Sequence, residues 1–122
     1  MQEPLEIIFR HAPKNTQLEG YILEQSKHLE KFFQRVVSCK VTVDKPQKSG
    51  LPAGLYKVRV DVGLPRRREI IIKKEAKISA TFDEICVLIK EAFKAAAREL
   101  EEIKEREFLP KRLSLEEVLE GK

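Results

Sequence analysis

The chain has 122 residues, of which 36% are charged, and its 24 lysines and arginines against 20 aspartates and glutamates give a formal net charge of +4. This length supports one domain with a single modest core, and so small a net charge does not imply indiscriminate binding of polyanions. No stretch reaches the roughly 20 apolar residues of a membrane span, and the amino terminus lacks the pattern of a signal peptide, so we expect a cytoplasmic protein.

The first part of the chain predicts a strand, a helix and a second strand. Apolar residues alternate along residues 5–10, as is typical of a strand. Thr16 and Glu19 have the spacing of a capping box, in which a hydroxyl and a carboxylate satisfy free backbone N–H groups at the start of a helix. We expect this helix to run to about Arg35, because apolar residues recur at helical spacing over that stretch. Valines then alternate with polar residues over residues 37–44, the pattern of a strand with one buried face.

A loop and a hairpin are expected next. Residues 46–54 contain two prolines and two glycines and therefore predict a loop. Alternating valines predict a strand over residues 57–62, and a further strand is expected over residues 70–72. Between these two strands, three consecutive arginines occupy the expected hairpin turn.

A long second helix is expected after this hairpin. Thr81 and Glu84 repeat the capping-box spacing, and apolar residues then recur at helical spacing. We expect the helix to end before Pro110, because a proline inside a helix removes one hydrogen bond and clashes with the preceding turn. The chain is thus divided into a domain over residues 1–107 and a short polar tail over residues 108–122.

The expected element order is β-α-β-β-β-α, and each helix has one apolar face. A sheet with one apolar face is covered most economically when both helices pack on the same side of it. The sequence therefore predicts an α+β fold, a two-layer sandwich of a four-stranded sheet with two helices packed on one face.

Both expected helices carry a row of cations at four-residue spacing. At about 100° per residue, each row forms one stripe roughly opposite the apolar face of its helix. The three arginines of the hairpin turn form a third basic group, and adjacent guanidiniums repel one another less when a phosphate is bound. These groups predict RNA binding. The candidate RNA-binding residues are Lys27, Lys31, Arg35, Arg66, Arg67, Arg68, Lys90, Lys94 and Arg98.

The helix charges have a second interpretation as ordinary solvated faces. Lysines on such faces pair with carboxylates about one turn away, for example Lys94 with Glu91, and His28 has Glu24 at the same kind of spacing. Residues 81–106 also hold more anions than cations. This alternative leads to a protein-interaction or regulatory module without RNA binding.

No residue pattern indicates an enzyme. The chain lacks a glycine-rich phosphate loop, a metal-spaced set of histidines and carboxylates, and a nucleophile elbow. His11 is interpreted as structural, and Cys39 and Cys86 as small core residues. The few aromatic residues fall at core-facing positions, so we expect contacts with phosphate and ribose rather than with stacked bases. We expect no cofactor, no metal and no small-molecule substrate.

Five stretches carry a resemblance to a known family, and they are Ile7-Ile8-Phe9-Arg10, Leu29-Glu30-Lys31-Phe32-Phe33, Arg35-Val36-Val37-Ser38-Cys39-Lys40-Val41, Ile89-Lys90-Glu91-Ala92-Phe93 and Arg98-Glu99-Leu100. Over about residues 5–106 the chain resembles the ribosome hibernation promoting factors, also called ribosome-associated inhibitors or sigma modulation proteins. It departs from the family at His28, where a lysine is frequent, and at Ala95 or Ala97, where a cation is frequent.

The resemblance implies binding in the messenger and transfer RNA channel of the small ribosomal subunit. There, cationic helix faces would contact ribosomal RNA and block translation, and no catalysis is implied. The expected partner is therefore the small ribosomal subunit, bound through its ribosomal RNA, and the free protein is expected to be a monomer.

Overall fold

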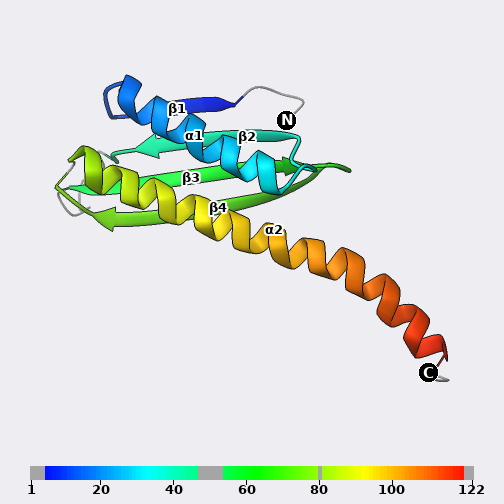
Figure 1. Cartoon of the computed structure of the whole chain (residues 1–122). Helices are drawn as coiled ribbons and strands as arrows, with labels where there is room; N and C mark the ends of the chain where they lie inside the picture. Colours follow the sequence, from blue (N-terminus) through cyan, green and yellow to red (C-terminus); the bar gives the residue numbers. More distant parts are fainter. Residues whose placement is uncertain (1–4, 47–53, 80, 120–122) are drawn as a thin grey trace.

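The computed structural model describes residues 5–46, 54–79 and 81–119, with side chains described as far as Lys104. Within these ranges the element order is the predicted β-α-β-β-β-α, and the α+β fold is confirmed (Figure 1). The elements are β1 Glu6–Arg10, α1 Thr16–Phe32, β2 Ser38–Asp44, β3 Leu55–Leu64, β4 Arg68–Lys77 and α2 Phe82–Leu119. Most of the loop predicted at 46–54 lies outside the described residues.

The strands form one mixed sheet in the order β1-β2-β3-β4. β1 pairs with β2 in parallel, which the intervening helix allows, whereas the β2–β3 and β3–β4 pairs are antiparallel. Both helices lie on the same face of the sheet and run side by side in the same direction (Figure 1). One face of the sheet is therefore covered by a helix layer, and the other face is open.

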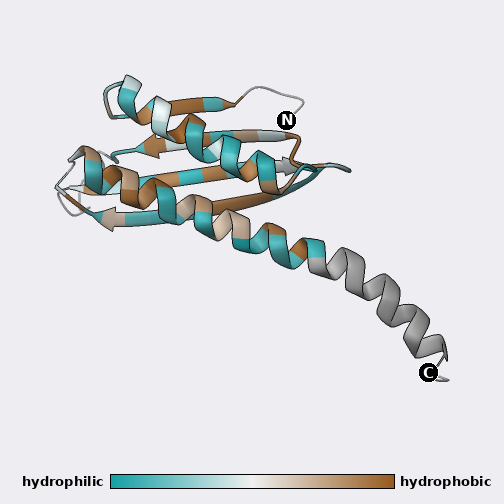
Figure 2. Cartoon of the chain, in the orientation of Figure 1, coloured by the Kyte–Doolittle hydropathy of each residue, from teal (hydrophilic) through white to brown (hydrophobic). Residues whose placement is uncertain are grey.

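The core lies between the helix layer and the covered face of the sheet. Alternate strand residues point into it, and the side chains of Val41 and Val60 are fully buried there. Figure 2 shows hydrophobic residues along the strands beneath the helices. Each helix adds a fully buried isoleucine, Ile22 in α1 and Ile89 in α2. Burial of one such side chain contributes about 1.5–3 kcal/mol, so these faces fix both helices on the sheet.

The start of α1 differs from the prediction. Its N-cap is Asn15, whose side-chain oxygen accepts hydrogen bonds from the backbone N–H groups of Gln17 (2.9 Å) and Leu18 (3.0 Å). The prediction that Thr16 caps this helix is wrong. Asparagine is at least as good a cap as threonine, and its position one residue earlier lets the helix begin one residue sooner.

The end of α1 also differs from the prediction. The helix ends at Phe32, and Arg35 lies in the turn that follows, so the expected end at about Arg35 is wrong. The next residue, Val36, is 3% exposed and its N–H donates a hydrogen bond to the carbonyl of Phe33 (3.2 Å). The chain therefore turns into the core here instead of continuing along the helix axis.

The capping residues of α2 are those predicted. The Thr81 hydroxyl accepts a hydrogen bond from the backbone N–H of Glu84 (3.2 Å), while the Glu84 carboxylate accepts from the Thr81 hydroxyl (3.0 Å). The same carboxylate accepts from the hydroxyl and backbone N–H of Ser79, and these bonds with Ser79 and Thr81 lower the pKa of Glu84. The start of α2 is thus fixed by a network of side-chain hydrogen bonds.

The end of α2 lies further along the chain than predicted. The helix continues through Pro110 to Leu119, and Figure 1 shows its last part projecting beyond the sheet. The expected end before Pro110 is wrong. A proline costs a helix one hydrogen bond and a clash with the preceding turn, but the residues around Pro110 are rich in the strong helix formers Glu, Lys, Arg and Leu, which favour continuation of the helix.

Replacement of Asn15 tests the cap assignment. Asn15→Ala should lower the free energy of unfolding by about 1 kcal/mol, because it removes the acceptor for two backbone N–H groups. Thr16→Ala is the matched control and should change that free energy by less than about 0.5 kcal/mol. Urea denaturation followed by circular dichroism measures both, and a larger loss for Thr16→Ala than for Asn15→Ala would contradict the assignment.

Candidate RNA-binding surface

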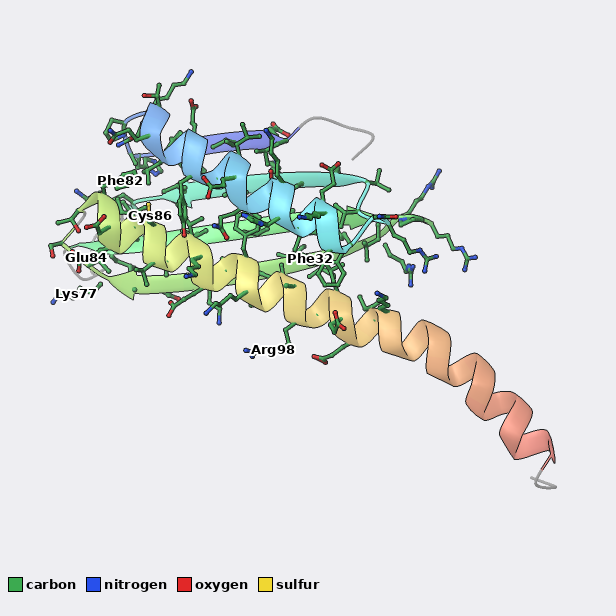
Figure 3. All side chains as sticks on the ribbon, viewed as in Figure 1. Phe32, Lys77, Phe82, Glu84, Cys86 and Arg98 are labelled. Atoms are coloured by element: carbon green, nitrogen blue, oxygen red, sulfur yellow. The ribbon has the colours of Figure 1, made fainter. Side chains whose placement is uncertain are left out.

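Five of the nine predicted basic residues lie on the outer surface of the helix layer. Lys27 and Lys31 lie on the face of α1 opposite its buried residues, and Lys90, Lys94 and Arg98 lie in the same way on α2. All five side chains are exposed, and Figure 3 shows Arg98 extending from α2 into solvent. Because the two helices are neighbours and run in the same direction, the two cationic rows lie next to each other.

The lysines of these two rows are unpaired. Within the described ranges, none of the four makes a hydrogen bond or an ion pair. The described residues also lack the two pairs that the solvated-face interpretation uses, Glu24 with His28 and Glu91 with Lys94. These lysines therefore contribute little to stability and are available to bind anions.

The open face of the sheet carries cations as well, and three of them have carboxylates as close neighbours. Lys40 in β2 lies opposite Glu6 of β1 on one side and Asp61 of β3 on the other. Lys57 lies between carboxylates of β2 and β4 in the same manner. Arg59 donates hydrogen bonds of 2.8 and 3.1 Å to the carboxylate of Asp61. Opposite charges that face each other across strands stabilise a sheet and weaken its field, so the part of this face around Lys40 and Lys57 attracts phosphate weakly, whereas Lys73 lies opposite Arg59.

Acidic residues limit the length of the basic surface on α2. Asp83 precedes the row of cations and Glu101 follows it, and both are exposed on the outward side of the helix. Repulsion of phosphate by these carboxylates confines the attractive part of α2 to the turns from Lys90 to Arg98.

The hairpin turn holds its arginines in a strained conformation. Residues 65–67 join β3 to β4, and both Arg66 (φ 66°) and Arg67 (φ 59°) have left-handed backbone. That conformation costs a residue with a side chain roughly 1 kcal/mol or more, and hairpin turns with two such positions favour Asn-Gly. Arg68 is half-buried and donates a hydrogen bond of 3.4 Å to the carbonyl of Pro65, so Arg66 and Arg67 are the exposed arginines of the turn. Strained backbone concentrates at binding sites.

The end of α1 lies at the same end of the sheet as this turn. The backbone N–H of Val37 donates a hydrogen bond of 2.8 Å to the carbonyl of Gly63, close to the hairpin turn. A Cβ atom at Gly63 would overlap Oγ of Ser38, so a larger residue there would require the Ser38 side chain to rotate away. We name this part of the molecule, residues 31–37 and 63–68, the hairpin end. It brings Arg35 to the same end of the molecule as Arg66 and Arg67.

The residues considered for other chemistry have structural environments. Nδ1 of His11 lies 3.2 Å from the carboxylate of Asp44, which links the end of β1 to β2. Cys39 and Cys86 are free and buried, as predicted. Burial, and secondly the carboxylate of Asp61, raises the pKa of Cys39 to about 12, so its thiol stays protonated. The part of the chain that the structure describes holds no cluster of three or more metal-binding side chains.

Phe32 is the surface residue that the sequence analysis missed. The aromatic residues are expected at core-facing positions, yet the side chain of Phe32 is 67% exposed, so that prediction is wrong for this residue. The helix ends at this residue, and the neighbouring Phe33 packs against the core instead.

Comparison with known proteins gives a consistent result. The family model described as sigma 54 modulation protein / S30EA ribosomal protein matches residues 5–107. The fold is similar to that of a ribosomal subunit interface protein from Coxiella burnetii, with a TM-score of 0.65 and 9% identity over 82% of this chain and 96% of the other. It is also similar to the N-terminal domain of Protein Y from Thermus thermophilus, with a TM-score of 0.61 and 14% identity over 80% and 94% of the two chains. No curated protein matches the sequence significantly.

Two matched double variants test the strain in the hairpin turn. Arg66→Asn with Arg67→Gly should raise the free energy of unfolding by about 1 kcal/mol, because these residues adopt left-handed backbone more readily. Arg66→Gln with Arg67→Gln removes the same charges but keeps a Cβ atom at both positions, and it should leave stability within about 0.5 kcal/mol of wild type. Urea denaturation compares them, and equal stability of the two variants would show that the turn stores no strain.

Proposed function

Because the chain belongs to the sigma 54 modulation protein / S30EA ribosomal protein family, we propose that it binds ribosomal RNA of the small ribosomal subunit through its helix layer and thereby inhibits translation. The contrast between its two faces carries this proposal. Among the described residues the lysines of the helix layer make no ion pair, whereas on the open face of the sheet Lys40 and Lys57 have carboxylates as cross-strand neighbours and Arg59 binds Asp61. An RNA backbone is attracted to the face with uncompensated positive charge.

The arrangement of the cations suits a phosphate backbone. Two rows on neighbouring parallel helices present positive charge along a strip instead of at one point. Packed helices lie about 8–10 Å apart, so lysines of both rows can contact phosphates of one folded RNA surface. Binding of this kind releases counterions and recognises the shape of the RNA more than its sequence.

The proposal assigns roles to the parts of the chain. Residues 1–107 form the ribosome-binding domain, and residues 108–122 are a polar appendage that the binding surface does not require. The protein acts in the cytoplasm as a monomer, needs no cofactor or small-molecule substrate, and performs no catalysis. Inhibition follows because a protein bound in the messenger and transfer RNA channel excludes these RNAs from it.

Matched charge variants test the proposal directly. A helix variant carries Lys→Gln changes at Lys27, Lys31, Lys90 and Lys94. A sheet variant removes the same charge from the open face through Lys→Gln changes at Lys40, Lys57, Lys73 and Lys77. All eight lysines are exposed, so both variants should fold. With about 4–6 phosphate contacts, wild-type binding to small subunits should show a log–log salt slope of roughly −3 to −5.

The two variants should separate clearly in sedimentation with purified small subunits at several salt concentrations. The helix variant should lose affinity, and its salt slope should be shallower by up to about four units, because each lysine contact with phosphate contributes about one unit. The sheet variant should keep the wild-type slope. Inhibition of in vitro translation should follow affinity. A helix variant with wild-type slope, or salt-independent binding by all three proteins, would favour the protein-interaction alternative.

A further inference from the structure

We infer that Phe32 stacks on an unpaired base of the bound RNA, so that the hairpin end contacts a nucleobase as well as phosphates. This inference rests on the proposed function. Phe32 is 67% exposed, the highest value among the exposed large hydrophobic residues of the described ranges, ahead of Val87 at 55% and Leu23 at 43%. Its ring is therefore accessible at the end of α1.

The ring is not needed for packing, but its backbone is held firmly. Phe33 packs against the core, and its N–H donates a hydrogen bond of 2.9 Å to the carbonyl of Leu29, which closes the last turn of α1. Val36 is buried directly after this turn. Phe32 thus lies between two anchored positions, so its binding to a flat partner needs little further ordering of the backbone.

Phe32 lies on the side of α1 that faces α2. Tyr21, His28 and Phe32 share one side of the helix at spacings of seven and four residues. Tyr21 interacts with Cys86 of α2, which after burial contributes to raising the pKa of Tyr21, so this side of α1 faces α2. Figure 3 shows Phe32 at the carboxyl end of α1, on the side of α2. The ring is therefore adjacent to the strip between the two cationic rows.

The charges around Phe32 identify RNA as the partner. The neighbouring Lys31 is exposed and unpaired in the described part of the chain, and the exposed arginines of the turn lie at the same end of the molecule. Phe82 provides the contrast, because it is 40% exposed but is followed by Asp83 and Glu84, which repel phosphate. An exposed aromatic ring among cations is the combination that binds a base and its flanking phosphates together.

Substitutions that separate stacking from simple hydrophobicity test the inference. Phe32→Tyr keeps a flat aromatic ring, whereas Phe32→Leu keeps an apolar side chain without one. Phe32→Leu should lower affinity for small ribosomal subunits about 5- to 100-fold, while Phe32→Tyr should stay within about twofold of wild type. Both should keep the wild-type salt slope, because no phosphate contact is lost. Val87→Leu, at an exposed position in α2, is the control and should bind like wild type.

The outcomes distinguish this inference from the proposed function. If wild-type protein does not bind small subunits, the proposed function fails. If wild-type protein binds and Phe32→Leu binds equally well, only the inference is overturned. If Phe32→Leu binds well and Phe32→Tyr binds poorly, an apolar side chain is sufficient and the tyrosine hydroxyl is not tolerated. Phe32 then contacts an apolar protein surface instead of a base, and the inference is overturned as well.

A spectroscopic measurement reports on stacking itself. The chain contains no tryptophan, so Phe32→Trp introduces a single fluorophore at the inferred stacking position. Single-stranded oligoadenylate at low salt should quench its fluorescence, and inorganic polyphosphate at equal phosphate concentration should not. Val87→Trp is the control, because it places a tryptophan at an exposed position where no stacking on a base is inferred. Its fluorescence should change little with either oligoadenylate or polyphosphate. An unchanged Phe32→Trp signal at saturating oligoadenylate, or equal quenching by polyphosphate, would overturn the inference.

Discussion

Burial of a single face of the sheet is the constraint on which the rest of the structure depends. The period of two in β2 and β3 places their valines on one side, and this apolar side must be covered. Both helices cover it in one layer, with Ile22 and Ile89 fully buried against it. The outer surfaces of α1 and α2 are then neighbours. Two rows of cations that lie far apart in sequence become one surface for this reason.

Three local features of the helix layer and hairpin end do not favour stability. The lysines of both helix rows lack the ion pairs that would add a few tenths of a kcal/mol each. Arg66 and Arg67 hold left-handed backbone at a cost, and Phe32 exposes its ring to water. On the open face of the sheet, in contrast, Lys40 and Lys57 each lie between two carboxylates of neighbouring strands, an arrangement that favours stability. Departures from local stability are expected at functional sites, and these features lie on the surface proposed to bind RNA.

The fold could be predicted because its signals are periodic and local. Alternation in the strands, helical spacing of apolar residues and the Thr81 cap each act over a few residues. The predicted helix ends were wrong where opposing local preferences lie close together. Asn15, and not the adjacent Thr16, caps α1, and α2 continues past Pro110 because strong helix formers surround this proline. The surface was harder, because exposure of Phe32 depends on where α1 ends, and strain in the arginine turn depends on the pairing of β3 with β4. The cancellation of charge on the open face requires the strand register, which no local pattern contains.

Lysine reactivity on the ribosome tests most directly which face of the protein contacts RNA. Free protein and its complex with small subunits are treated with an amine-acetylating reagent, and modification of each lysine is measured by mass spectrometry. The account predicts that bound RNA protects Lys27, Lys31, Lys90 and Lys94, while Lys40 and Lys57 on the open sheet face stay as reactive as in the free protein. Protection confined to Lys40 and Lys57, or absent from the helix lysines, would contradict it.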